Sequence, residues 1–331
     1  MDDYSRVHVC RRRMLAAMRR RSFLTGIAAA TAIAAPSHVR AQGLATVRCG
    51  SVPLDGYGQP YYGVAGGIFR DAGIDLQVTD LANSGAIAAA ITGGSLDVGL
   101  GSVSQIAGAK EKGLPYTFFA PGAVYAADAP SSQLMVEKNS PIHAARDLVG
   151  KTVAVDNLTS FTQFATLEWL RNNGVDPSSV KFVELPYPAM PGALEAGRVD
   201  AATIAEPART VALATARILA DTNAAIAPSW FISVWFTTEA WIAANLALAH
   251  RLARAVVQTS VWANAHHAET AAVLEKATKM PHDVIMTMQR SRFGTKLSPA
   301  LMDPLIDIAA KHNMIAAPIA ARTLIYPGFA S

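Results

Sequence analysis

A repeated order of strand and helix patterns constrains the fold of this 331-residue chain more than any other feature. Short apolar runs alternate with stretches of helical periodicity, and glycine ends most of the helical stretches. The first set predicts strands at 47–52, 76–81 and 96–100, with helices at 59–72 and 84–92. The second set predicts strands at 152–155, 180–185 and 199–204, with helices at 160–173 and 189–196. Strands that alternate with helices form parallel sheets, so the sequence predicts an α/β protein with two lobes, each a mostly parallel sheet flanked by helices.

The connecting segments predict how the lobes are joined. Residues 121–131 are rich in small residues and indicate a first crossover, and the strand pattern at 230–237 indicates a second one that leads the chain back. Helices expected at 240–265, 268–279, 281–289 and 299–312 are then left to cover lobe one. We therefore expect lobe one to contain 42–127 plus 240–331 and lobe two to contain 128–239, joined by two hinge crossovers. Ligands of open α/β sheets bind outside the carboxyl ends of the strands, so both sets of loops should line one cleft.

The first 41 residues have the pattern of an export signal. Arg20 and Arg21 precede an apolar run at 26–35, and a small-residue end follows at Ala41. The paired arginines indicate the twin-arginine type of signal, with cleavage near Ala41. The alternative is a basic amphipathic helix of the mature protein. The export interpretation predicts a periplasmic protein.

Removing this segment changes the charge of the chain. Residues 1–41 hold 8 of the 29 Lys and Arg residues and 2 of the 25 Asp and Glu residues, so the remainder has 21 basic and 23 acidic residues, net −2. We therefore expect no nucleic-acid partner. Cys10 is removed with the signal, so Cys49 has no intrachain partner for a disulfide. No apolar run after residue 41 is long enough to cross a membrane.

Three motifs, in order along the chain, resemble the periplasmic binding proteins of the nitrate, sulfonate, taurine and thiamine-precursor importer group. They are VAGGIFRDAGIDL at 64–76, DLVGK at 147–151, and ALEAGRVDA at 193–201 followed by Glu206 and Pro207. The resemblance implies a two-lobed clamp of the periplasmic-binding-protein fold and an ATP-driven (ABC) permease as partner. The stretch 55–62 is richer in aromatic residues than the corresponding stretch of that group.

Hydroxyl side chains follow several predicted strands, where helices begin. Helix N-termini offer free N–H groups and a partial positive charge, which suit polar or anionic ligand atoms. On this basis Ser84, Ser102, Ser104, Thr159 and Ser160 are candidate ligand contacts. The alternative for each is that the side chain only caps its own helix.

Further candidates come from the loops expected in the cleft. The aromatic side chains are Tyr57, Tyr125, Phe161 and Tyr187, and Gln59 lies in the same stretch as the first of them. Packing in the core is the alternative for each aromatic ring.

Glu206 follows the fifth strand of the predicted second lobe and could accept hydrogen bonds from an amine or hydroxyl. The alternative for this carboxylate is a salt bridge to Arg209.

Basic residues are scarce in these loops, and Arg209 is the one plausible cation. A dianion would normally recruit Arg or Lys, so a monoanion held by amides, a zwitterion or a neutral aromatic compound fits better. His266, His267 and His282 lack companions at metal-ligand spacing, so we expect neither a metal nor a cofactor.

These observations predict a monomeric, non-catalytic solute-binding protein. Hinge closure would enclose a small organic ligand, sulfonate-, amino- or aromatic-acid-like, for delivery to the permease. One alternative is an enzyme on the same scaffold that acts on a pyrimidine-type precursor, although no nucleophile–base motif is present. Another alternative is an exported ligand-sensing module.

Overall fold

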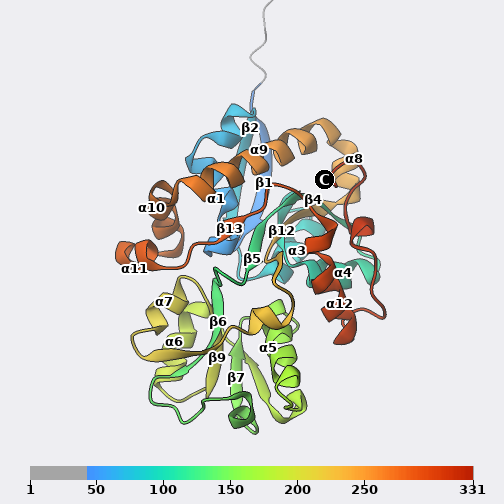
Figure 1. The fold of residues 1–331 in the computed structure, drawn as a ribbon. Coiled ribbons are helices and arrows are strands. Elements are labelled where there is room, and N and C mark those ends of the chain that lie inside the picture. The colour runs from blue at the N-terminus through green and yellow to red at the C-terminus, as the bar shows by residue number, and fades with distance from the viewer. Residues whose placement is uncertain (1–42, 331) are drawn as a thin grey trace, which may run out of the picture. The chain divides into compact units, whose positions relative to one another are not determined.

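The computed structural model describes residues 43–330, and the predicted export signal lies outside this range. The described residues form an α/β structure with two five-stranded sheets and a small three-stranded sheet (Figure 1). Within this range, no helix is both long and apolar enough to cross a membrane. The predicted α/β class with two sheets is confirmed.

The first sheet defines the part of the molecule that we call lobe one. Its order is β2-β1-β3-β12-β4. The strands are β1 (Ala45–Ser51), β2 (Ile74–Asp80), β3 (Val98–Gly101), β4 (Tyr116–Pro121) and β12 (Val234–Thr238). β1 is parallel to β2 and β3, whereas β12 is antiparallel to β3 and β4.

The second sheet defines lobe two and has the same plan. Its order is β10-β6-β9-β7-β8. The strands are β6 (Ser132–Glu137), β7 (Thr152–Val155), β8 (Lys181–Glu184), β9 (Ala201–Ala205) and β10 (Ala216–Ala220). β7 is parallel to β8 and β9, whereas β6 is antiparallel to β9 and β10. Each sheet is therefore mixed: β12 in the first sheet and β6 in the second, by which the chain enters each lobe from a crossover, run opposite to the other four strands.

The crossovers contain the third sheet, with the order β11-β5-β13. Its strands are β5 (Ala123–Ala126), β11 (Ser229–Phe231) and β13 (Arg292–Phe293). The single strand expected at 230–237 is thus two strands, β11 and β12. Ser233 marks the break, because its hydroxyl accepts a bond from the Ala123 amide and donates to the Gly56 carbonyl. β12 pairs within the first sheet, so the expected end of lobe two at residue 239 is corrected: the chain has already returned to lobe one there.

Two helices that the sequence predicts as continuous are each divided into two. The helix expected at 59–72 is α1 (Gln59–Ala65) and α2 (Ile68–Asp71), because Gly67 adopts a left-handed backbone with φ of 71°. The helix expected at 240–265 is α8 (Glu239–Ala244) and α9 (Leu246–Ala265), separated by the non-helical Asn245.

The other helices lie near their expected positions, except α7, which was not predicted, and α4, for which only the start was expected. They are α3 (Ser84–Thr92), α4 (Val103–Glu111), α5 (Phe161–Asn172), α6 (Met190–Glu195), α7 (Ala208–Ala212), α10 (His267–Thr278), α11 (His282–Thr287) and α12 (Asp303–Lys311).

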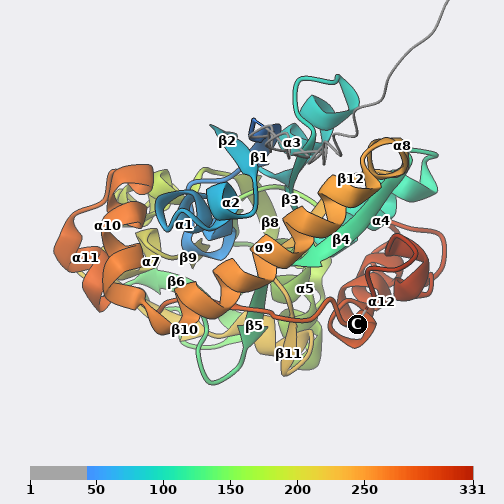
Figure 2. The same cartoon turned by 90° about the horizontal axis from the view of Figure 1, so that it is seen from above.

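The C-terminal helices cover lobe one but also touch lobe two. α9 contacts α1 and β4 (Figure 2). At the other lobe, α11 contacts α7 and α12 contacts α5. The α12 contact is an ionic cluster in which Lys311 and His312 both bind the Glu168 carboxylate.

The apolar cores of the two lobes meet at α5. Lobe one and the crossovers share one cluster, with Trp230, Trp235 and Phe118 fully buried, and Phe161 and Phe164 of α5 join it from lobe two. In lobe two, alternate residues of the strands enter two clusters on opposite faces of the sheet, with Ala154 in one and Val153 in the other. The central strands of this sheet are therefore covered on both faces, whereas the edge strand β8 is mostly exposed.

Candidate functional site

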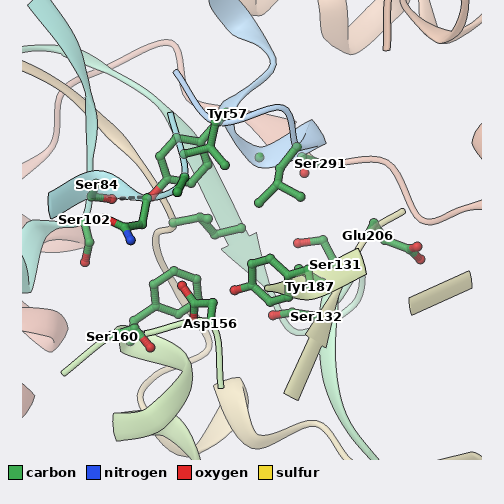
Figure 3. Close-up of a pocket in the computed structure, with 18 of the residues that line it drawn as sticks. Tyr57, Ser84, Ser102, Ser131, Ser132, Asp156, Ser160, Tyr187, Glu206 and Ser291 are labelled. Atoms are coloured by element: carbon green, nitrogen blue, oxygen red, sulfur yellow. Dashed lines mark hydrogen bonds between the residues drawn. The ribbon is translucent and has the colours of Figure 1, made fainter. Parts of the chain in front are cut away.

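A pocket lies where the carboxyl ends of strands from both lobes meet (Figure 3). The centre of a water molecule can reach about 50 Å³ of it. Its residues come from the loops after β1, β2 and β3, from the loops after β7, β8 and β9, and from both crossovers. The lining residues are Val52, Leu54, Gly56, Tyr57, Ala82, Asn83, Ser84, Ser102, Gln105, Ser131, Ser132, Asp156, Ser160, Phe161, Tyr187, Ala205, Glu206, Ile232 and Ser291. The position agrees with the general placement of ligands in open α/β sheets.

The wall from lobe one carries hydroxyl groups and no ionised side chain among its described lining residues. The Tyr57 hydroxyl and Ser84 Oγ are 2.9 Å apart and share a hydrogen bond, drawn in Figure 3. Ser51 Oγ donates to the Tyr57 carbonyl at 2.7 Å, which fixes the loop after β1. Burial raises the pKa of Tyr57 to about 12, so this hydroxyl stays protonated at neutral pH.

Helix caps explain part of the polar lining. Asn83 Oδ1 accepts a bond from the Ala86 amide at the start of α3, and Ser160 Oγ accepts one from the Gln163 amide at the start of α5. Ser102 precedes α4 but makes no such cap, because its hydroxyl pairs with Ser104 Oγ at 3.0 Å. The first turn of α4 therefore keeps uncapped amides next to the pocket.

The wall from lobe two contains a partly buried carboxylate, Asp156, directly after β7. Thr162 Oγ1 donates to Asp156 Oδ1 at 2.5 Å. Burial raises the pKa of Asp156, while hydrogen bonds from the hydroxyls of Thr162, Ser160 and Tyr187 oppose that rise. The same burial, together with the nearby Asp156 charge, raises the pKa of Tyr187 well above its ordinary value.

The second carboxylate of the pocket, Glu206, is already neutralised. Arg209 donates to its Oε1 through Nε at 2.7 Å and forms a salt bridge at 2.5 Å. The amide and hydroxyl of Thr210 and the amide of Gln289 donate to the same carboxylate. Figure 3 shows the carboxylate turned away from the middle of the residues drawn. The salt bridge to Arg209, the alternative interpretation of Glu206, is present, although Glu206 also lines the pocket.

A family model, NMT1/THI5 like, matches residues 58–270, which include the lobe-two wall of the pocket and the lobe-one residues Asn83, Ser84 and Ser102. The chain belongs to the NMT1/THI5-like family. The taurine-binding periplasmic protein of Escherichia coli (strain K12) is 26% identical to it over 154 residues. That match spans 46% of this chain and 46% of the relative, so the chain matches about half of the relative's length.

Solved structures agree with the NMT1/THI5-like assignment at the level of the fold. The alkanesulfonate-binding protein SsuA from Xanthomonas axonopodis pv. citri has a TM-score of 0.71 at 16% identity, covering 86% of this chain and 99% of that one. The desulfurization enzyme DszB has a TM-score of 0.65 at 16% identity, covering 86% and 97%. These likenesses establish the type II periplasmic-binding-protein fold that the sequence predicted.

The pocket of this NMT1/THI5-like protein brings together most of the residues singled out from the sequence. Those that line it are Tyr57, Ser84, Ser102, Ser160, Phe161, Tyr187 and Glu206.

Two predicted residues, Gln59 and Tyr125, lie in the core instead. Gln59 donates to Ser260 Oγ at 2.8 Å and accepts a bond from Trp235 Nε1 at 2.9 Å, so its amide is used within lobe one. The Tyr125 ring stacks on Trp230 with centroids 5.1 Å apart, and its hydroxyl donates to Asp221. Gln59 begins α1 and Tyr125 lies in β5, and both side chains are buried there by these partners.

Ser104 and Thr159 also lie outside the pocket. Ser104 is fully buried behind Ser102, one step further along α4. Thr159 is exposed, has a left-handed backbone with φ of 73°, and borders a hollow between α3 and α4. The left-handed residue turns its side chain away from Ser160, its neighbour in the pocket.

Six polar residues of the lining were not among the predicted site residues: Asn83, Gln105, Ser131, Ser132, Asp156 and Ser291. Asp156 had a usable signal, because it is the first residue after a predicted strand. Ser132 begins β6, at the end of the first crossover. Ser291 had no signal, because it comes from the connection between α11 and β13. Its amide donates to Asp55 Oδ2, and Asp55 also pairs with Arg290, which anchors this segment against the pocket.

The arrangement can bind a small polar molecule but offers little for catalysis. The described lining residues include no Cys and no His, and among residues 43–330 no group of three His, Cys, Asp or Glu residues is arranged to hold a metal. Cys49 is fully buried in β1, where burial raises the pKa of its thiol, so it is not a reactive nucleophile.

Proposed function

We propose that this protein is a periplasmic solute-binding protein that binds a small organic ligand between its lobes and delivers it to an ABC import permease. The observation that carries the proposal is the composition of the pocket, which takes its walls from the strand ends of both sheets and from both crossovers. A ligand there would contact both lobes at once, so binding favours the closed form. Its family membership and its partial match to a taurine-binding periplasmic protein support the same role.

The crossovers are suited to act as hinges in this proposal. β5 and β11 pair side by side in the small sheet, so both connections between the lobes pass through this sheet. We propose that lobe two moves against lobe one about this sheet. Polar contacts between the lobes, such as Gln105 Nε2 to Asn157 Oδ1 at 3.3 Å, would form and break with the motion.

The proposed ligand contacts are the residues that the pocket brings together. Tyr57, Ser84 and Ser102 would act from lobe one, and Ser160, Phe161 and Tyr187 from lobe two. The small volume and the absence of a lining cation among these residues favour a compact zwitterion, monoanion or neutral molecule over a dianion. We propose that the protein acts as a monomer, since the pocket is complete within one chain.

An enzymatic role is the second candidate, because DszB shares the fold. The buried Cys49 and a described lining without Cys or His make it the weaker one.

Native mass spectrometry of protein purified from the periplasm of its host tests the proposal. We expect a co-purified small molecule, and small-angle scattering should show compaction when that molecule is added back. A protein that carries no small molecule, binds none from a panel of organic acids and amines, and keeps one shape would refute the binding role. Detection of a released, chemically altered product would instead support the enzyme.

A further inference from the structure

The charge of the pocket is not balanced within the protein. Two carboxylates line it, Asp156 and Glu206, and the described lining residues include no Lys, Arg or His. Two arginines stand behind the lining, and each is already paired: Arg209 with Glu206, and Arg290 with Asp55. Asp156 therefore has no cationic partner among the described lining residues.

The described contacts of Asp156 are uncharged donors. Thr162 donates directly to Oδ1, and the hydroxyls of Ser160 and Tyr187 and the backbone amide of Asp156 itself also stabilise the ionised form. A carboxylate offers about four acceptor positions, and Thr162 uses Oδ1, so Oδ2 can accept a further donor from the cavity. A partly buried carboxylate without a cation is costly, and a charged donor from outside would relieve that cost.

A second group in the same pocket also lacks a partner. Ser291 is 4% exposed, and its hydroxyl oxygen makes no hydrogen bond to any residue of 43–330. Ser291 comes from the C-terminal tail, far from Asp156 in the sequence, so it is an independent sign that the pocket is built for a polar guest.

Aromatic rings complete the surroundings. Tyr57, Phe161 and Tyr187 line the same space, and the faces of such rings attract cations. Asp156 raises the pKa of both tyrosines, one from each lobe, and all three residues line the same pocket. A carboxylate beside aromatic rings is the chemistry that recognises an ammonium group.

Resting on the proposed function, we propose that Asp156 receives a protonated amine of the ligand, so that the solute is a small amine or zwitterion and not a simple anion. The uncapped amides at the start of α4, on the wall from lobe one, can donate hydrogen bonds to an anionic group. A zwitterion would therefore pair its cation with Asp156 and its anion with these amides. An anion alone leaves Asp156 unpaired and is repelled by it.

The test uses three probes of similar size that differ in their charged groups. Water centres reach about 50 Å³, roughly three to five water molecules, so the probes must be compact. Ethanolamine carries only the cation, ethanesulfonate only the anion, and taurine both. Isothermal titration of the wild-type protein with each probe gives the selectivity before any mutation is made.

We expect ethanolamine and taurine each to bind about tenfold or more tightly than ethanesulfonate. Asp156→Asn should weaken both amines by about tenfold or more and leave ethanesulfonate unchanged or improved. The matched control is Asp221→Asn, because Asp221 also accepts a tyrosine hydroxyl but lies outside the pocket lining. This control should leave all three affinities unchanged.

Ethanesulfonate binding as tightly as the amines, failure of both amines to bind, or an unchanged amine affinity in a folded Asp156→Asn protein would each overturn the proposal. Tight ethanesulfonate binding with compaction would overturn only the amine inference and leave the binding-protein function standing. The co-purification experiment judges that function separately.

Discussion

The ends of β7 and β9 are adjacent in one sheet, and each places a carboxylate at the same pocket. Their surroundings differ. Glu206, after β9, is held by Arg209, Thr210 and Gln289, and is turned away from the cavity (Figure 3). Asp156, after β7, has only uncharged donors, the hydroxyls of Thr162, Ser160 and Tyr187 and its own backbone amide, among its described contacts. A position at a strand end is therefore not enough to make a carboxylate a ligand contact. The neighbouring charges decide whether it forms an internal salt bridge or can still bind a ligand.

The largest expected change in stability comes from removing the cation that pairs with Glu206. Arg209→Met removes the cation and leaves Glu206 buried without it, with 2% of the residue exposed. Removing one partner of a buried pair costs about 3–5 kcal/mol of unfolding free energy. Urea unfolding measures this loss.

The control for that measurement is Arg146→Met, because the Arg146 side chain is 85% exposed beside Asp147. An exposed pair of this kind should contribute less than about 1 kcal/mol. Equal losses in the two variants would show that the Glu206 pair is not structural.

A smaller effect of opposite sign is expected at Asp156. Asp156→Asn should stabilise the ligand-free protein at pH 7 by roughly 0.5–2 kcal/mol, because it removes an unpaired carboxylate that lowers the stability of the folded state. Burial raises the pKa of Asp156 above its ordinary value of 3.8, so between the unfolded and folded pKa values the native state binds more protons. The stability of the wild type therefore falls as the pH rises through that window.

The gain from Asp156→Asn should accordingly be largest at neutral pH and vanish below about pH 3.8, where both states are protonated. Thermal unfolding across this pH range measures it. Asp128→Asn is the control, because the Asp128 side chain is 70% exposed. A destabilised Asp156→Asn protein would mean that the carboxylate supports the fold, as Glu206 does.

The smallest effect is expected at Ser291. Ser291→Ala removes a buried hydroxyl oxygen that has no partner, so the ligand-free stability should change by less than about 1 kcal/mol and not fall. Affinity for the co-purified ligand should drop by a few fold if the hydroxyl contacts it. Titration and thermal unfolding of the same sample separate the two results, and a clear loss of stability would show that the hydroxyl has a structural role.

The sequence alone determined the class of fold and the edge of each sheet that forms the site. Periodicity marked the strands, and the residues just beyond them include Tyr57, Ser84, Ser102 and Ser160, all in the pocket. Asp156 lay in the same kind of position and could have been predicted by the same rule. These features are local, because a strand end is fixed by residues that are neighbours in the chain.

Only the tertiary structure decided which of these side chains are paired within the protein and which can still contact a ligand. It turned Gln59 and Tyr125 into the core through partners such as Ser260 and Asp221, 201 and 96 residues away in the sequence. It also brought Ser291 into the pocket and set the Gln289 amide on Glu206, 83 residues before it. Burial and pairing depend on distances between segments that are remote in the sequence. Local periodicity therefore located the carboxylates, and only the folded chain showed which one is paired.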